Sequence, residues 1–455
     1  MNIRTTLAMA IAAGMASSVA FAAVSEKEAE QLGTTLTLFG AEKAGNADGT
    51  IPAYDGGLPV TTAPDGWKAG SGRYEHGPYD DEMSLFSISA ENVDQYKDKL
   101  TAGVYDIIKK FPEFRLDVYP THRSVAHSEH YLSLCESNAL NAVAKPSGNG
   151  ISGAFGCAPF PIPKSGIEAM WNHLLVDRLG ARAQTLTSAW LVDASGHLTD
   201  ITHIKLEFVH YFLDQSKNKM DGAVAEARLG AWDGPPVQVG TKILQKFPMD
   251  YDEGQLLSWI YTPGQRRTRL APEFAYDTPI ASTGGVLNYD EQFGFNGQLD
   301  RYNWELVGKK EIYIPYNGYR EIFAPVKELW AKRFVNPDVS RWELHRVWVV
   351  EATLKEGKRH VQPKRTFYLD EDSWSIVASD AYDQGGSLYR VGVFPTIQLW
   401  DVQTTFNAFV FYDVNKGTGY ASNVLSRSGD YISVEPTVGD TRIFTPEAMT
   451  AGGIR

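Results

Sequence analysis

The sequence lacks long apolar runs, an excess of basic residues and a serine-hydrolase motif. Beyond residues 7–22, no apolar run reaches the roughly 18 residues that a membrane span needs, so we expect no spanning helix in the mature chain. There are 43 Lys and Arg against 55 Asp and Glu, and the formal charge of −12 argues against nucleic acid as the partner. No G-x-S-x-G elbow occurs, so no α/β-hydrolase serine is indicated.

The apolar run at residues 7–22 has the organisation of an export signal. Arg4 precedes it, and it ends in Ala20-Phe21-Ala22. A basic start, a short apolar core and a small-x-small end are typical of a secretory signal peptide, so we predict cleavage after Ala22. No Cys lies near the cleavage point, which excludes lipid attachment at a new N-terminal Cys.

The chain has two cysteines, Cys135 and Cys157, and they form no Cys-x-x-Cys pair. Both follow the predicted signal, and in an oxidising compartment such a pair usually forms a disulfide. We therefore expect a structural bridge without a redox-active role. The loop between them is rich in Gly, and closing it would stabilise the fold by roughly 3 kcal/mol.

Dense strand signals and an aromatic content of 12% predict a β-rich α+β fold. We expect a signal peptide over 1–22, an irregular and helical segment over 23–165 packed on the main domain, and a curved-sheet domain over 166–455. Consecutive antiparallel strands predict a large curved sheet or an incomplete barrel covered by helices. Helices are expected at 25–38, 90–100, 103–111, 167–179, 217–229 and 319–334. Strands are expected at 185–192, 198–213, 242–247, 256–262, 311–315, 342–354, 361–369, 374–381, 388–393 and 402–412.

The most informative segment is QLLSWIYTPGQRRTRLAPEFAYD, residues 255–277. Its Pro-Gly pair suits a turn between two strands. Trp259 and Tyr261 share one face of the first strand, and Arg266 and Arg267 begin the second. An aromatic face beside a basic strand suits an apolar ligand with a polar or anionic head.

Aromatic side chains elsewhere are expected to be mostly core, but an open barrel cannot fill its whole interior. A concave sheet lined with rings is the default site for an apolar ligand. The predicted ligand-binding residues are Trp259, Tyr261, Arg266, Arg267, Trp304, Tyr313, Tyr316, Trp348 and Tyr368.

Four longer segments resemble one protein family: GAEKAGNADGTIPAYDGG, FNGQLDRYNWELVGKKEIYIPYN, ELHRVWVVEATLKEGKRHVQPKRTFYLDEDSW and YDQGGSLYRV. With the hairpin, they resemble a proteobacterial family of periplasmic proteins labelled outer-membrane lipoprotein-sorting-like, related to the Lol-type carriers. The resemblance implies a periplasmic location and an incomplete barrel with a helical lid over an apolar cavity.

Three short motifs could indicate a ligand or metal site, but each also has a purely structural interpretation. Residues 148–153, GNGISG, match G-x-G-x-x-G but follow no strand and open no helix, so a nucleotide site is not expected. His122, His127 and His130 fit no zinc spacing. Residues 46–55 imitate part of a calcium loop, but Ala44 occupies the first ligand position, and turn chemistry explains them as well.

The sequence therefore predicts a periplasmic carrier or binding protein for a lipid, an acyl chain or a bulky apolar compound. An inner-membrane exporter or an outer-membrane channel would be its partner, and no catalytic residue, metal or cofactor is expected. Two alternatives stay open. One is an envelope hydrolase with a carboxylate pair drawn from Glu305, Glu343 and Glu351, although pairing with Arg301, Arg346 and Arg365 is favoured. The other is an outer-membrane assembly factor that binds by strand addition.

Overall fold

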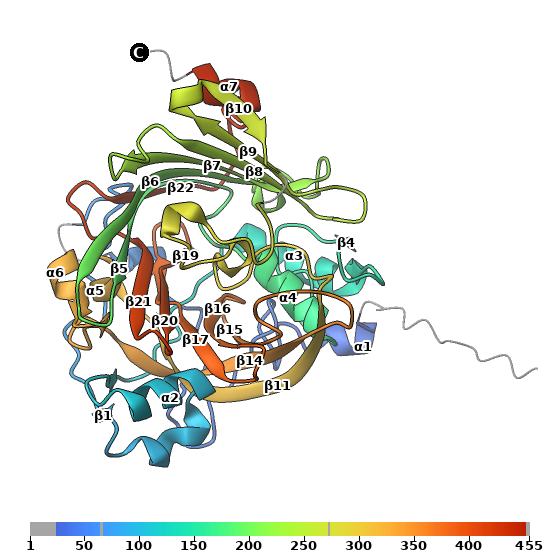
Figure 1. Cartoon of the computed structure of the whole chain (residues 1–455). Coiled ribbons are helices and arrows are strands. Elements are labelled where there is room, and N and C mark those ends of the chain that lie inside the picture. Colours follow the sequence, from blue (N-terminus) through green and yellow to red (C-terminus); the bar gives the residue numbers. More distant parts are fainter. Residues whose placement is uncertain (1–23, 64–66, 272–273, 452–455) are drawn as a thin grey trace, which may run out of the picture.

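One large curved sheet organises the chain (Figure 1). The computed structural model describes residues 24–63, 67–271 and 274–451, so the predicted signal peptide lies outside the described residues. Within them, sixteen strands belong to this sheet. The order is β1-β2-β14-β15-β16-β17-β20-β21-β5-β6-β7-β8-β9-β10, with β11 also paired to β14 and β22 to β5. Neighbouring strands are antiparallel except β2 and β14.

Most strands of the large sheet pair with the strand that precedes or follows them in the chain. Their bounds are β1 Phe86–Ile88, β2 Leu116–Val118, β5 Arg182–Val192, β6 Leu198–His210, β7 Val224–Gly234, β8 Lys242–Pro248, β9 Leu257–Thr262, β10 Arg267–Leu270, β11 Tyr302–Pro315, β14 Trp342–Leu354, β15 Lys364–Asp370, β16 Ile376–Tyr382, β17 Leu388–Val393, β20 Phe409–Asp413, β21 Thr418–Val424 and β22 Tyr431–Glu435. Three small two-stranded sheets are formed by β3 Val143–Ala144 with β4 Ile151–Ser152, β12 Trp330–Ala331 with β13 Phe334–Val335, and β18 Thr396–Leu399 with β19 Thr404–Asn407.

The sheet curves around a segment that belongs to none of its strands. In Figure 1, β6 to β10 arch across the top, β5, β21 and β20 descend, and β11 and β14 form the base. Residues 274–301, drawn in yellow between β10 and β11, lie inside this curve. We call them the covering segment. The predicted β-rich α+β fold with a large, open, curved sheet is confirmed.

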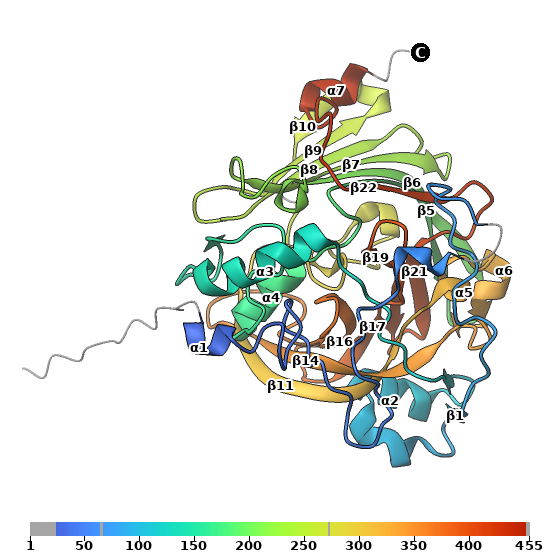
Figure 2. The same ribbon diagram turned by 180° about the vertical axis from the view of Figure 1, so that it is seen from behind.

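Helices pack on the sheet rather than forming a layer of their own. They are α1 Glu26–Ala29, α2 Ala102–Lys110, α3 Glu129–Asn141, α4 Gly166–Leu174, α5 Tyr319–Ile322, α6 Val326–Leu329 and α7 Pro446–Ala451. In Figure 2, α3 and α4 lie side by side at the open side of the sheet. Gly166 lets α4 approach β11, because a Cβ there would lie 2.8 Å from the carbonyl carbon of Trp304. In the described residues, no helix is both long and apolar enough to span a membrane.

The predicted disulfide is confirmed. Cys135 of α3 is bonded to Cys157, 22 positions further along the chain. The Asn138 side-chain amide adds hydrogen bonds to the same loop, donating to the carbonyl of Cys157 over 2.9 Å and to that of Phe155 over 3.1 Å. Helix α3 itself was not predicted.

Several predicted helices are corrected by the structure. Residues 217–229 do not form a helix, because most of their second half belongs to β7, which is hydrogen-bonded to β6 and β8 on its two sides. The helix expected at 25–38 shrinks to α1, and the one at 319–334 divides into α5 and α6 at Pro325. The helix expected at 90–100 is a 3-10 helix over Val93–Lys99. The prediction for 103–111 was right to within one residue at each end.

Candidate functional site

A cavity of about 140 Å³ lies between the concave face of the sheet and the covering segment. Its sheet side is formed by β5 to β8, β20 and β21, and most of its wall is apolar. The sheet contributes Thr187, Thr202, Ile204, Leu206, Phe208, Arg228, Gly230, Trp232, Ile243, Gln245, Phe409, Tyr420, Ser422 and Asn423. The covering segment contributes Ile280, Ser282, Thr283, Leu287, Tyr289, Gln292 and Phe293.

Strand alternation and register explain why these side chains share one face. On β6 the lining residues include Ile204, Leu206 and Phe208, every second position. Leu206 is opposite Gly230 of β7, which is in turn opposite Ile243 of β8. Opposite residues of antiparallel strands point to the same face. Gly230 leaves the centre of this face open, since a Cβ there would already lie 3.1 Å from side-chain carbons of Ile204 and Ile243.

A buried arginine stands at one side of the cavity. Arg228 of β7 forms an ion pair with Glu226 on the same strand, and its Nη2 also donates to Asn296 over 3.3 Å. Its Nη1 is buried and has no hydrogen-bond partner in the described structure. Burial alone would raise the pKa of Glu226, but Arg228 and His210 outweigh it and hold that pKa well below the usual range.

A second buried arginine lies close to the first. The guanidinium carbon of Arg178 is 4.0 Å from the centre of the Phe293 ring, and that of Arg228 is 4.7 Å from the same ring. Among the described residues, the Arg178 side chain has no ion-pair or hydrogen-bond partner. Burial, and then the nearby charge of Arg228, lowers the pKa of Arg178 to about 9.

The covering segment is fixed to the sheet by buried ion pairs. Asp290 accepts from Arg365 of β15 over 2.8 Å and lies 2.9 Å from Nε2 of His360. Glu291 accepts from Arg390 of β17 over 2.7 Å. Asp290 and Glu291 lie next to the lining residues Tyr289, Gln292 and Phe293 in the chain. The ion pairs therefore fix the covering segment over the cavity.

The hairpin predicted at 255–277 is present, but its aromatic residues do not line this cavity. Trp259 of β9 is opposite Leu244, and Tyr261 is opposite Lys242. The cavity residues of β8 are Ile243 and Gln245, so the two aromatic side chains lie on the other face of the sheet. That face is near α7, where Lys242 Nζ donates to the carbonyl of Met449 over 2.9 Å. Ligand binding by Trp259 and Tyr261 stays a prediction.

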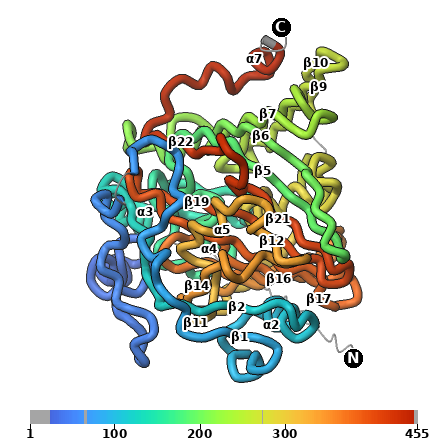
Figure 3. The backbone as a smooth tube through the Cα atoms, turned by 90° about the vertical axis from the view of Figure 1, so that its left-hand side faces the viewer, coloured from blue at the N-terminus to red at the C-terminus, as the bar shows by residue number. Residues whose placement is uncertain are grey.

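The hairpin arginines lie at the end of the sheet. Arg266 ends the turn after β9 with a left-handed backbone (φ 49°), and Arg267 begins β10. Both side chains are exposed, and neither lines the cavity. Figure 3 shows β9, β10 and α7 together at one extremity of the molecule. A role for Arg266 and Arg267 in ligand binding also stays a prediction.

The other predicted ligand-binding residues lie on β11, β14 and β15, with Tyr316 directly after β11, rather than at the cavity. Trp304 packs on Phe295 and Phe367, and Tyr313 on Phe86 and Tyr96. Trp348 stacks on Trp374. The hydroxyl of Tyr316 donates to Asp370, and that of Tyr368 to Asp380. These are packing and hydrogen-bonding contacts within the protein, and ligand binding by these five residues stays a prediction.

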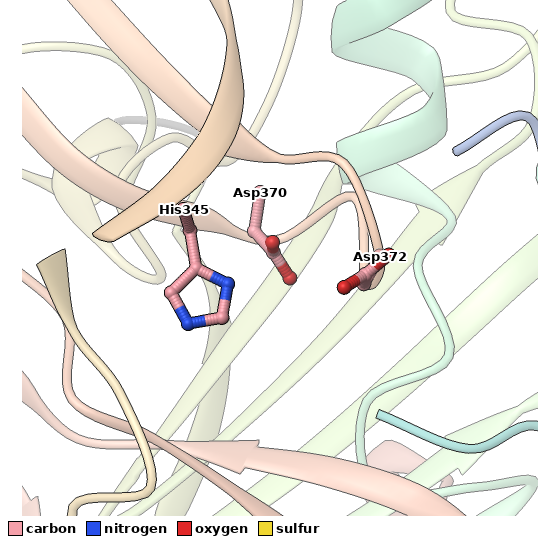
Figure 4. A group of neighbouring side chains, drawn as sticks. All are labelled: His345, Asp370 and Asp372. Atoms are coloured by element: carbon pink, nitrogen blue, oxygen red, sulfur yellow. The ribbon is translucent and has the colours of Figure 1, made fainter. Parts of the chain in front are cut away.

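A second polar cluster consists of His345 of β14, Asp370 at the end of β15 and Asp372 in the turn that follows, and Figure 4 shows these side chains close together. Each offers one atom that could bind a metal ion, and these atoms lie within 4.8 Å of one another. Both carboxylate oxygens of Asp372 already accept from Arg123, over 2.6 and 2.9 Å. Burial, and next the charge of Asp372, raises the pKa of Asp370 to about 6. The observed bonds are those of a structural ion-pair network.

The short motifs have structural roles. Residues 148–150 lie in the turn between β3 and β4, so no helix follows them. His122 stacks on Tyr79, whereas His127 stacks on Tyr131, so the histidines do not converge. In the loop at 46–55, the side-chain oxygen of Asn46 accepts from the backbone N–H of Ile51 over 2.8 Å, which is turn chemistry.

The carboxylates named for hydrolysis do not lie at the cavity either. Glu343 is bound by Arg341 and His345, and Glu351 by Lys364. The expected partners of Arg301, Arg346 and Arg365 need correction, because their carboxylates come from turns and loops rather than from the aromatic strands. Arg301 pairs with Asp277, Arg346 with Glu371 and Arg365 with Asp290.

Comparison with known proteins identifies relatives along most of the chain. A family model described as a protein of unknown function, DUF1329, matches residues 87–450. The uncharacterized protein PA3922 of Pseudomonas aeruginosa is 37% identical over 451 residues, covering 98% of this chain and 97% of its own.

Solved structures with similarity to the chain were also found. A domain described as outer-membrane lipoprotein-sorting, from Vibrio parahaemolyticus, has a TM-score of 0.43 and 14% identity over 63% of this chain and 98% of its own. A DUF1329 family protein from Desulfovibrio piger has a TM-score of 0.40 and 16% identity over 59% and 92% of the two chains. A LolA superfamily protein from Nitrosomonas europaea has a TM-score of 0.35 and 11% identity over 62% and 98%. The match of one family model along most of the chain agrees with the family resemblance expected from the sequence motifs.

Proposed function

Because the chain belongs to the DUF1329 family, whose description names no function, we propose a function from its own cavity: periplasmic binding and carriage of a hydrophobic molecule. The observation that carries the proposal is the largely apolar cavity enclosed by the concave sheet and the covering segment. An apolar cavity of similar size, about 150 Å³, binds a benzene-sized molecule. One ring or a short chain would therefore fill this one.

Binding would be driven by removal of apolar surface from water. This contributes about 25 cal/mol per Å², or about 0.8 kcal/mol for each CH₂ group. Asp290 and Glu291 fix the covering segment to the sheet. A ligand chain longer than the cavity would therefore have to displace the covering segment. Passage to an exporter or an outer-membrane channel would involve the same displacement.

The test is calorimetric titration of the mature chain with a series of unbranched alcohols from butanol to dodecanol. These probes are neutral, so they report on the apolar cavity alone. We expect affinity to rise by about 0.8 kcal/mol per CH₂ and to level off when the cavity is full. Absence of binding by every alcohol in the series would contradict the proposed function.

A further inference from the structure

Buried positive charge that one carboxylate does not balance lies beside the apolar cavity: Arg228 lines the cavity, and Arg178 contacts the lining residue Phe293 without lining the cavity itself. Arg178 and Arg228 are 8% and 6% exposed, and both lie against Phe293. Glu226 is the carboxylate bonded to Arg228, and His210 shares it, with Nε2 3.6 Å from Oε1. Among the described residues, Glu226 is the carboxylate that pairs with Arg228, and buried Asp177, on which the charge of His210 acts, pairs with neither guanidinium group.

The hydrogen-bonding capacity of these arginines is also incompletely used. Glu226 accepts from Nε and Nη2 of Arg228, which leaves Nη1 buried without a partner. The Arg178 side chain contacts the face of Phe293 and has no acceptor among the described residues. Burying an unpaired charge or donor is costly unless an acceptor is supplied.

We propose that the cavity binds an anionic amphiphile, whose apolar part lies along Ile204, Leu206 and Ile243 and whose carboxylate or phosphate is held by Arg178 and Arg228 beside Phe293. This inference rests on the proposed function and names the ligand class. A guanidinium group suits the role because its planar donors match a carboxylate or a phosphate. The anion would supply the missing counter-charge.

The size of the cavity limits the apolar part. Because the cavity measures about 140 Å³, an eight-carbon chain is a suitable probe. Three octyl compounds separate the possible heads: octanoate carries a carboxylate, octyl phosphate a phosphate, and octanol no charge. Comparing the two anions distinguishes a fatty-acid source from a phospholipid-like source.

The experiment is titration calorimetry of the mature, oxidised chain with each octyl compound. We expect at least one anion to bind tenfold or more tightly than octanol, a difference of about 1.4 kcal/mol. In Arg178→Met this preference should disappear while octanol affinity stays within twofold. Arg359→Met, at an exposed arginine of the loop between β14 and β15, is the matched control and should keep the preference.

The outcomes separate the two proposals. Equal binding of octanol and both anions by the unaltered protein overturns the anionic-ligand inference and leaves the proposed function standing. Binding by none of the three contradicts the proposed function and the inference together. This comparison needs no variant, so it decides the matter even if Arg178→Met does not fold. A preference that survives in a folded Arg178→Met removes Arg178 from the site.

Discussion

At the scale of single residues, Gly230 lines the centre of the cavity without a side chain of its own. A Cβ at this position would lie 3.1 Å from side-chain carbons of Ile204 and Ile243 and 3.2 Å from one of Leu206. The contact atoms of Ile204 and Leu206 are terminal methyl groups, whereas that of Ile243 is its Cγ2 branch, so a larger residue has to displace these side chains and occupy part of the cavity. The missing side chain is therefore what keeps the centre of the cavity open.

We predict that Gly230→Val weakens octanol binding at least tenfold while the protein stays folded. The matched control is Ala231→Val, since Ala231 is next on β7 and faces the opposite side of the sheet. It should leave affinity within twofold. Calorimetric titration measures both, and equal loss in the two variants would show that this cavity is not the binding site.

A different residue controls the response to pH. Glu321 of α5 is buried, with Ser340 Oγ donating to it over 2.8 Å, and burial raises its pKa to about 7 from 4.5. A raised pKa means that the folded state holds the proton more tightly than the unfolded state. Its contribution to stability is complete below pH 4.5 and is lost as pH rises through 7.

We predict that Glu321→Gln removes this part of the pH dependence. The shift corresponds to roughly 3 kcal/mol of unfolding free energy between pH 4.5 and pH 8. Urea unfolding of both proteins at pH 4.5 and 8 measures it, with the unaltered protein losing more stability on going to pH 8. If both proteins lose the same amount, Glu321 does not titrate in this range.

At the scale of elements, the covering segment depends on buried pairs that join it to the sheet. Glu291 accepts from Arg390 of β17, and both side chains are almost fully buried. Removing one member of a buried pair leaves an uncompensated charge, whereas replacing both often costs little.

We predict that Arg390→Met alone destabilises the protein by roughly 3–5 kcal/mol, and that adding Glu291→Gln recovers most of the loss. Urea unfolding measures both. The exposed pair of Asp440 and Arg442 serves as the control, because Arg442→Met should cost no measurable stability. If the double variant is as unstable as the single one, the pair of Glu291 and Arg390 is not what fixes the covering segment.

Strands could be predicted from the sequence where apolar residues alternate along them. The bounds of β14 and β17 were right at both ends, since alternating apolar residues identify a strand locally. Strand β7 was mistaken for a helix because its Ala and Arg residues favour helices, and its strand form depends on β6 and β8. That error hid Glu226 and Arg228, two of the charged residues at the cavity. The apolar alternation of Ile204, Leu206 and Phe208 on β6 was the sequence signal that could have indicated this wall of the cavity.

The cavity of the proposed function lies on other strands than the ligand-binding residues predicted from the sequence. An aromatic surface beside arginines was expected on β9 and β10, but the cavity has Phe208, Phe293 and Arg228 instead. The covering segment, which closes the cavity, has no regular strand, so periodicity could not reveal it. Contacts between segments this far apart depend on the curvature of the sheet, which a local pattern does not specify.

At the scale of the whole molecule, the disulfide makes the stability of the fold depend on the redox conditions of its compartment. Cys135 and Cys157 are both completely buried, and the bridge joins α3 to the loop before α4. An exported chain reaches an oxidising environment in which such a bridge forms, whereas the cytosol keeps thiols reduced. The location of the protein therefore affects its stability.

We predict that the periplasmic protein begins at Ala23, contains no free thiol, and loses roughly 3 kcal/mol of unfolding free energy when reduced. The same chain expressed without residues 1–22 should accumulate in the cytosol with two thiols and the lower stability. Intact-mass analysis with and without thiol alkylation, followed by urea unfolding, measures each point. The Cys135→Ala/Cys157→Ala variant is the control, because reduction should not change its stability. Two free thiols in the exported protein, or a mature N-terminus several residues from Ala23, would contradict the periplasmic assignment on which transport across the envelope depends.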